Sequence, residues 1–198
     1  MLTELMALND AIPLRQSQLT RFHSRAPPQI SPLDYLRRIA RFCSLEKSAL
    51  LAIVFYIDLL CCVFTTFTIN SLTVHRFLIT AATVASKGLC DSFCTNTHYA
   101  KVGGISLPEL NFLELEFLVR VGWRVVPRHE TLSQYYVRMV ARMGSVYTLA
   151  ADTDDGPDPL AGVPSPGLPP EVAAAVDRAT GGSPRSDAAT KDARSDRD

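Results

Sequence analysis

The 198-residue chain carries 20 Lys and Arg residues against 20 Asp and Glu residues, so its formal net charge is zero. That length suits one core-bearing domain of about 100–150 residues with an appendage, and it excludes two full domains. The charge is uneven, because residues 151–198 hold ten acidic and five basic residues. The basic excess left on residues 1–150 is too mild to make nucleic acid the expected partner, which requires Lys and Arg clustered on one face.

Cysteine usage and the first residues indicate the compartment. The five cysteines, Cys43, Cys61, Cys62, Cys90 and Cys94, form an odd set without regular spacing, which argues against a disulfide scaffold. The first ten residues lack the basic and apolar segments of a secretory signal. We therefore expect a cytoplasmic or nuclear location. The run Cys90-x3-Cys94-x3-His98 lacks a fourth close ligand, so we expect neither a metal nor another cofactor.

The first predicted elements are helical. Residues 1–27 hold scattered apolar side chains and predict an N-terminal extension that is helical in part and interrupted at Pro13. Ser31 followed by Pro32 and Asp34 is typical of a helix start. Apolar residues then recur at helical spacing, which predicts a helix over residues 32–42.

Five further helices are predicted, over residues 45–64, 72–87, 97–102, 107–122 and 131–143. Gly88 is expected to close the second of these five in the left-handed conformation. Ser106 and Glu109 have the spacing of a capping box, in which the serine side chain and the glutamate carboxylate each accept from a free backbone N–H. Strand patterns are nearly absent, so the sequence predicts an all-α fold.

Residues 49–69 form an almost continuous apolar run in which Asp58 is the only formal charge. Twenty-one residues are long enough to cross a bilayer, so a small membrane protein anchored by this run is one alternative. A carboxylate near the midplane would cost about 2.5–3.5 kcal/mol. The centre of a helical domain equally requires a helix that is apolar on all sides, and we favour that interpretation, with no membrane partner.

Residues 151–198 differ in composition from the rest of the chain. Pro and Gly make up twelve of these 48 residues and aromatic residues are absent. Such a segment cannot bury enough apolar surface to offset its conformational entropy, so we expect a disordered tail. Ser165 and Ser183 each precede a proline there, and both are candidate phosphorylation sites.

Two glutamates in the helix after Ser106 have different surroundings. Glu116 has Arg120 one turn later, which gives a ready ion pair. Glu114 has no cationic neighbour in its own helix, so its carboxylate either faces water or meets a charge from another element. Lys87 lies at the end of an earlier helix, where the helix dipole favours a cation.

Several segments occur together in a familiar order. The sequence contains VHR, ASK, THYAKVGG and ELNFLELEFL between residues 74 and 118, preceded by SPLDYLRRIARFCSLEKSALLAIVFYIDLL. This order and spacing resembles a cyclin box, most closely that of the P-type, phosphate-regulatory cyclins. The resemblance covers residues 28–128 and implies a single cyclin box, a five-helix bundle around a buried third helix. An additional helix over residues 129–147 would then pack on the box. The MRxILxDWL segment through which A- and B-type cyclins recruit substrates is absent.

The resemblance also implies a function. It implies a protein that is no enzyme but binds and activates a cyclin-dependent Ser/Thr kinase, in cell-cycle or nutrient-response control, with substrates recruited through the complex. In cyclins the lysine of the ASK-like tripeptide and a glutamate of the fifth helix pair at the kinase interface, and these match Lys87 and Glu114. Phe77, Leu110 and Phe117 are the expected apolar contacts with the kinase αC helix. The chain has no Gly-rich phosphate loop, HRD, DFG, GxSxG or HExxH motif.

Two alternatives remain at this stage. Cyclin-like boxes also occur in transcription adaptors that do not activate a kinase, although those carry two boxes and only one fits here.

The helix at residues 32–42 carries Arg37, Arg38 and Arg41 on overlapping turns. This strip is either an ordinary solvated face or a contact for acidic or phosphorylated substrates or for the kinase activation loop.

Overall fold

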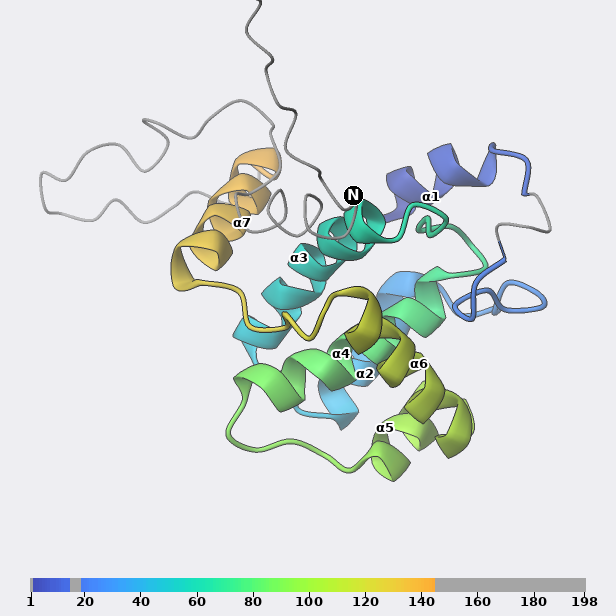
Figure 1. Cartoon of the computed structure of the whole chain (residues 1–198). Coiled ribbons are helices and arrows are strands. Elements are labelled where there is room, and N and C mark those ends of the chain that lie inside the picture. The colour runs from blue at the N-terminus through green and yellow to red at the C-terminus, as the bar shows by residue number, and fades with distance from the viewer. Residues whose placement is uncertain (1, 15–18, 145–198) are drawn as a thin grey trace, which may run out of the picture.

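A buried helix lies at the centre of the molecule (Figure 1). The computed structural model describes residues 2–14 and 19–144, and within these ranges it has seven helices and no strand. Helix α4 (Val74–Leu89) packs against α2 (Pro32–Phe42), α3 (Lys47–Val63), α5 (Asn96–Gly103) and α6 (Leu107–Arg120). Twelve of its 16 residues are buried, among them every residue from 77 to 86. The predicted bundle of five helices around a buried third helix is confirmed.

Local hydrogen bonds explain where several helices begin. The Ser31 side chain accepts from the Asp34 backbone N–H at 3.1 Å, which caps α2. The Ser106 side chain accepts from the Glu109 N–H at 3.3 Å, which caps α6. The Glu109 carboxylate forms an ion pair with Arg76 of α4. The serine half of the predicted capping box therefore forms, while the glutamate joins α6 to the central helix.

The predicted cap at Gly88 is wrong. Helix α4 continues through Gly88 to Leu89, and Cys90 leaves it in an extended conformation with its N–H bonded to the Ser86 carbonyl. The left-handed glycines among the described residues are Gly104, which closes α5 at φ +69°, and Gly122. A Cβ on Gly88 would lie 3.5 Å from the Val125 side chain, so this glycine lies where the chain after α6 crosses α4.

The apolar run of residues 49–69 forms most of α3, which ends at Val63, and the loop that follows it. No helix in the described part of the chain is both long enough and apolar enough to cross a membrane. Asp58, the single charge in this run, accepts a hydrogen bond from the Tyr135 hydroxyl at 2.6 Å. Burial, with the Asp58 carboxylate as a second cause, raises the pKa of Tyr135 well above its usual range. The hydroxyl therefore stays protonated and acts as the hydrogen-bond donor to Asp58.

Helices α1 (Leu2–Asp10) and α7 (His129–Arg142) lie on either side of α3 in Figure 1. Helix α7 begins and ends close to the predicted 131–143 and packs on α3 through Tyr135, whose ring meets that of Phe55 edge-on at 5.9 Å. Helix α1 has no buried residue. Several predictions lie outside the described residues: residues 145–147 of the predicted 129–147 helix, the expected tail over 151–198, and the candidate phosphorylation sites Ser165 and Ser183.

Candidate functional site

Lys87 and Glu114 meet at the outer edge of α4 and α6. The Lys87 Nζ lies 2.6 Å from Glu114 Oε1, which brings together the two residues that the sequence singled out. The lysine follows directly on the buried run of α4, and the Glu114 side chain is 13% exposed while that of Lys87 is 33% exposed. The carboxylate without a partner in its own helix therefore meets a cation supplied by another element, 27 residues away in sequence.

Asn96 completes this pair. Its side-chain amide donates to Glu114 Oε2 at 2.8 Å and lies 2.8 Å from Asn111 Oδ1. Both carboxylate oxygens of Glu114 are thus engaged, one by Lys87 of α4 and the other by the first residue of α5. Sequence reasoning did not identify Asn96. Its only local signal is its place after the N-cap Thr95, and that signal says nothing about a carboxylate on another helix.

Glu116 has a different role. It accepts from Arg120 of its own helix at 2.9 Å, as the spacing predicts. The Arg120 guanidinium also lies 4.1 Å from the centre of the Phe64 ring, a cation–π contact that reaches the loop after α3. Glu116 therefore orients an arginine within the same molecule and does not contact Lys87.

The three apolar residues expected at the surface lie in the core instead. Phe77, Leu110 and Phe117 each have no exposed area. Phe117 packs edge-on against Tyr56 of α3 at 5.3 Å, and Phe77 meets the Phe67 ring at 5.9 Å. In this structure they cannot contact another protein. Helical spacing cannot distinguish the face of α4 or α6 that is covered internally from the face left open.

Other apolar side chains are exposed on α6 and in the segment that follows it. Leu115 follows Glu114 on α6 and is 51% exposed, while Trp123 and Val126, in the segment after α6, are each 64% exposed. The Val126 side chain lies 3.9 Å from the Cβ position of Gly88, the neighbour of Lys87. We call Lys87, Glu114, Leu115, Trp123 and Val126 the α4–α6 edge.

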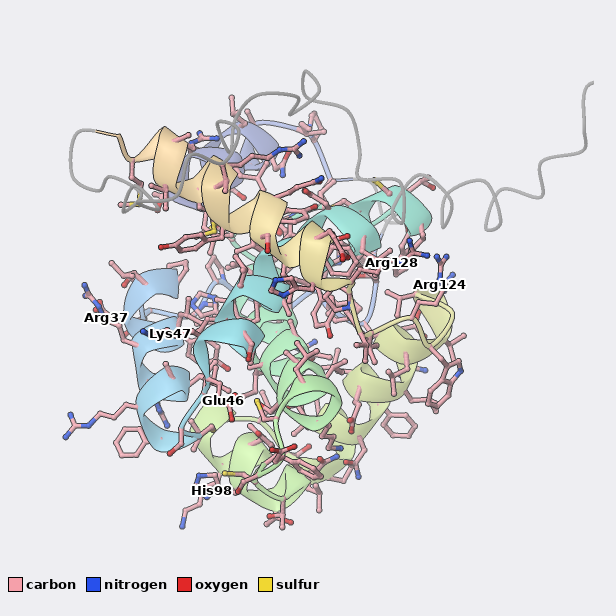
Figure 2. All side chains as sticks on the ribbon, turned by 90° about the vertical axis from the view of Figure 1, so that its left-hand side faces the viewer. Arg37, Glu46, Lys47, His98, Arg124 and Arg128 are labelled. Atoms are coloured by element: carbon pink, nitrogen blue, oxygen red, sulfur yellow. The ribbon has the colours of Figure 1, made fainter. Side chains whose placement is uncertain are left out.

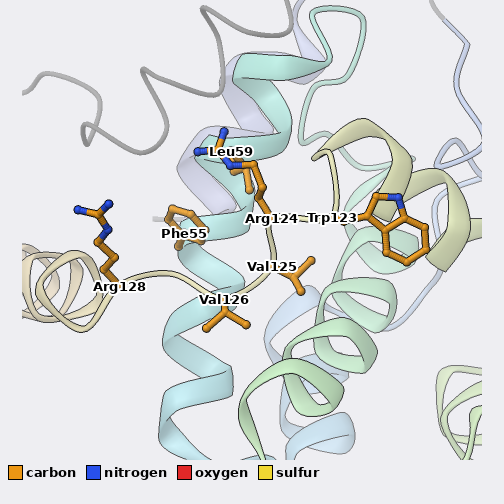
Figure 3. A pocket seen from close by; sticks show the side chains of 7 residues that line it. All are labelled: Phe55, Leu59, Trp123, Arg124, Val125, Val126 and Arg128. Carbon is orange, nitrogen blue, oxygen red and sulfur yellow. The ribbon is translucent and has the colours of Figure 1, made fainter.

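The segment that carries Trp123 and Val126 is held in place by its backbone. Trp123 has a left-handed φ of +62° and its N–H donates to the Leu118 carbonyl at 2.8 Å. Figure 3 shows this segment passing in front of α3, with Phe55 and Leu59 facing it across a hollow of about 310 Å³. The conformation of this turn fixes an exposed tryptophan at the start of the segment that leads to Val126.

The arginines of α2 lie on an exposed face. Arg37, Arg38 and Arg41 are all exposed, and Arg37 pairs with Asp34 at 3.2 Å. Figure 2 shows Arg37 projecting from the side of the molecule opposite to Arg124 and Arg128. The strip therefore lies on a different side of the molecule from the segment that carries Arg124 and Arg128.

The cysteines do not form a reactive or metal-binding cluster in the described part of the chain. Burial raises the pKa of Cys43 to about 12 and that of Cys61 to about 12, so both are protonated thiols at neutral pH. His98 bonds through Nε2 to the Phe42 carbonyl at 2.8 Å. Within residues 2–14 and 19–144 no group of three or more His, Cys, Asp and Glu side chains is placed to hold a metal ion.

Comparison with known proteins agrees with this geometry. The cyclin family model matches residues 4–125, so the match begins before the predicted box at residue 28. The Nuc-1 negative regulatory protein preg of Neurospora crassa is 59% identical over 145 residues, which cover 72% of this chain and 30% of that protein. PHO85 cyclin PHO80 of Saccharomyces cerevisiae is 52% identical over 137 residues, covering 67% and 47%.

A plant protein shares the same region. Cyclin-U4-1 of Arabidopsis thaliana is 36% identical over 129 residues, which are 65% of this chain and 64% of that protein. The chain thus spans less than half the length of the two fungal relatives. What all three share with it is the helical region that contains the Lys87–Glu114 pair.

Proposed function

This chain belongs to the cyclin family, and on that premise we propose that it is the regulatory subunit of a cyclin-dependent Ser/Thr protein kinase and no enzyme itself. The observation that carries the proposal is the 2.6 Å contact between Lys87 of α4 and Glu114 of α6. Relatives named as PHO85 cyclins support a kinase partner. Because the sequence resembles the phosphate-regulatory branch, we favour nutrient response over the cell cycle as its setting.

The proposed mechanism supplies what an isolated kinase lacks. In such a kinase the αC glutamate is turned away from the strand lysine that holds the ATP phosphates, so the charged clamp on the phosphates is incomplete. The α4–α6 edge would give αC a rigid surface on which to dock in the productive pose. The edge is rigid because α4 is fixed by four other helices of the bundle.

Hydrogen-bonding capacity at the pair suits this role. A lysine ammonium has three donors, and Glu114 takes up one of them. Glu114 itself is held by both Lys87 and Asn96, so its position is set before docking. The lysine donors left over can bond kinase backbone carbonyls and fix the register of the complex, while charged groups held in advance lose little freedom on binding.

Apolar area at the edge would supply most of the affinity. Leu115, Trp123 and Val126 are each more than half exposed, and exposed tryptophans are the residue type that most often dominates binding energy in protein interfaces. These three replace Phe77, Leu110 and Phe117 as the proposed apolar contacts with the kinase.

The test uses the full-length chain and the kinase that co-purifies with it. Lys87→Glu and Glu114→Ala are expected to abolish kinase activation, because truncating one partner of a charge pair buried in a complex typically costs about 2–5 kcal/mol. Kinase pull-down and phosphorylation of a peptide substrate measure the effect. Circular dichroism must stay native for the loss to count as an interface effect.

Two controls make the test specific. Glu116→Ala, on the same helix, loses the pair with Arg120, an exposed i,i+4 contact worth about 0.2–0.5 kcal/mol, and is expected to bind the kinase almost normally. The double variant Lys87→Glu with Glu114→Lys restores an internal ion pair with reversed polarity, so it should recover stability without recovering activation. Equal damage from Glu116→Ala and Glu114→Ala, or full activation by the reversed pair, would overturn the assignment of this edge.

A further inference from the structure

The exposed face of α2 carries positive charge that the proposed function does not use. Arg37, Arg38 and Arg41 are all exposed. Lys101 is exposed too and lies on α5, which packs beside α2. Asp34 is the single acidic residue of these two helices, so they hold four basic side chains against one acidic side chain. A helix face that only meets water typically alternates charges of both signs, so this excess marks the face as a site for an anion.

Asp34 does not neutralise the three arginines. Its carboxylate accepts from the Ser31 hydroxyl at 2.7 Å and from Arg37 at 3.2 Å. A guanidinium has five N–H donors, and this contact uses one of those of Arg37. In the part of the chain that the structure describes, neither Arg38 nor Arg41 forms an ion pair. Most donors of the strip therefore have no acceptor among the described residues.

The arginines start from an anchored helix. Arg37 and Arg41 are one turn apart on α2, so they share a face, with about 5–6 Å between their Cβ atoms. The Arg41 guanidinium lies 5.7 Å from the centre of the Phe42 ring, and the Phe42 carbonyl lies 2.8 Å from Nε2 of His98 on α5. Lys101 follows His98 by three positions, which places it on the same face of α5. Its charge therefore adds to that of the arginines at this end of α2.

Paired arginines suit a phosphate monoester better than a carboxylate. The planar guanidinium forms two parallel hydrogen bonds to phosphate oxygens. A phosphoserine or phosphothreonine offers three oxygens and a charge of about −1.5 to −2 at pH 7. Leu33, one turn before Arg37, is 56% exposed, and Phe42, next to Arg41, is 57% exposed. These two apolar side chains can contact the residues on either side of a phosphorylated one.

The size of the face argues against a nucleic acid. Helix α2 has 11 residues, which is about 16 Å of helix. Proteins that bind duplex DNA commonly neutralise about 6–10 phosphates, more than three arginines and one lysine can reach. A single phosphorylated side chain matches the number of donors.

We propose that Arg37 and Arg41 bind the phosphate of a phosphorylated serine or threonine in a substrate of the kinase. This inference rests on the proposed function, because the partner kinase produces such residues. Arg37 projects from a different side of the molecule than the segment 124–128 (Figure 2), which contains Val126 of the α4–α6 edge. A phosphorylated segment can therefore be held while the kinase is bound, so a substrate phosphorylated once would be retained for phosphorylation at a second site.

Binding is measured first without any kinase. The probe is a short fluorescein-labelled peptide with one phosphoserine between two leucines, and fluorescence anisotropy reports its affinity for the full-length chain. Arg37→Gln with Arg41→Gln should weaken binding at least about tenfold, the loss that one charge-assisted hydrogen bond accounts for. Arg37→Lys with Arg41→Lys keeps the charge without the paired donors and should bind several-fold more weakly than the unchanged chain. Arg128→Gln with Arg142→Gln, the matched control, removes two charges from the ends of α7 and should bind normally.

A second measurement separates this inference from the proposed kinase function. Lys87→Glu should still bind the phosphopeptide although it no longer activates the kinase. Arg37→Gln with Arg41→Gln should activate the kinase normally on a peptide with one site. Its defect should be confined to the second site of a substrate that is already phosphorylated once.

Four results would overturn the inference. One is unchanged phosphopeptide binding after Arg37→Gln with Arg41→Gln. Another is equal affinity for the peptide with serine or aspartate in place of phosphoserine. A third is full affinity after Arg37→Lys with Arg41→Lys, which would mean that charge alone attracts the peptide. The last is tighter binding of a short DNA duplex or of phosphatidylserine vesicles that the same substitutions abolish, which would assign the face to a nucleic acid or a membrane.

Discussion

Helices α4 and α1 are both largely apolar in sequence, yet the molecule holds them in opposite ways. Helix α4 buries twelve of 16 residues among four neighbouring helices. Helix α1 buries none of its nine fully: Leu2, Leu5 and Met6 pack partly buried against the edge of the core, and Asn9 and Asp10 make hydrogen bonds at its end. Lys87 directly follows the buried run of α4. The comparison teaches that the position of the α4–α6 edge is set by full burial on several sides, whereas that of α1 is set by partly buried contacts and a few hydrogen bonds.

Breaking the packing around α4 should have the largest effect. Phe117→Ala removes a fully buried ring that contacts Tyr56 of α3, and such changes cost about 3–5 kcal/mol. Urea denaturation followed by circular dichroism measures the free energy of unfolding. Kinase binding is expected to fall only as far as the folded fraction falls.

Phe117→Ala also shows whether the Phe117 ring belongs to the core or contacts the kinase. Leu115→Ala, two residues earlier on the exposed face, should leave stability nearly unchanged and weaken kinase binding. If instead Phe117→Ala kept its full stability and lost the kinase, the ring would be a surface contact, as the resemblance to cyclins had implied.

Weakening the contact between α7 and α3 should lower the stability by an intermediate amount. Tyr135→Phe removes the hydroxyl that donates to Asp58 and leaves a partly buried carboxylate without that donor, which costs about 1–3 kcal/mol. Tyr136→Phe is the control, since Tyr136 is 54% exposed on the same helix. Equal thermal midpoints for the two variants would mean that this bond contributes nothing to the docking of α7.

Sequence reasoning reached the fold and the charged pair for different reasons. Helix positions follow from local signals, such as the caps at Ser31 and Ser106, which act within one turn and can be read from spacing. Lys87 and Glu114 were reached through resemblance to cyclins, with support from one local fact, a glutamate without a cation in its own helix.

What the sequence could not provide depends on contacts between distant segments. Asn96 bonds to Glu114 across 18 residues, and no local pattern encodes that meeting. The burial of Phe77, Leu110 and Phe117 depends on which face of each helix the other helices cover. Gly88 was expected to end α4 because glycine often does, but here the helix continues beneath Val125.

Acid should lower the stability of the fold through His75 of α4, by a smaller amount than the substitutions above. Burial lowers the pKa of His75 below its usual value near 6.5. The His75 Nε2 lies 2.8 Å from the Ile30 carbonyl, which fixes the proton there, and the buried Nδ1 has no hydrogen-bond partner. A second proton would therefore be buried without an acceptor, so the folded state stays neutral where the unfolded chain already binds a proton.

The sign of the pH dependence follows from this difference. The stabilising contribution is complete above pH about 6.5 and is lost as the pH falls from there through the lower pKa of the folded state. Urea midpoints measured at several pH values between about 7.5 and 5 should decline on the acid side. His75→Gln keeps a donor for Ile30 and cannot titrate, so its decline should be shallower. A slope identical to that of the unchanged protein would contradict the assignment to His75.

Releasing α1 should have the smallest effect on global stability. The Asn9 side chain donates to the Ile69 carbonyl at 2.7 Å, and the Asp10 carboxylate accepts from the Ser71 N–H at 2.9 Å. Asn9→Ala with Asp10→Ala removes both contacts, and because they are partly or fully exposed the loss should be about 1 kcal/mol or less. Hydrogen exchange should rise over residues 2–10 while α4 stays protected, since local opening of a peripheral helix does not require the core to open. Faster exchange in α4 would mean that α1 and the bundle unfold as one unit, and the contrast between the two helices would then be one of exposure alone.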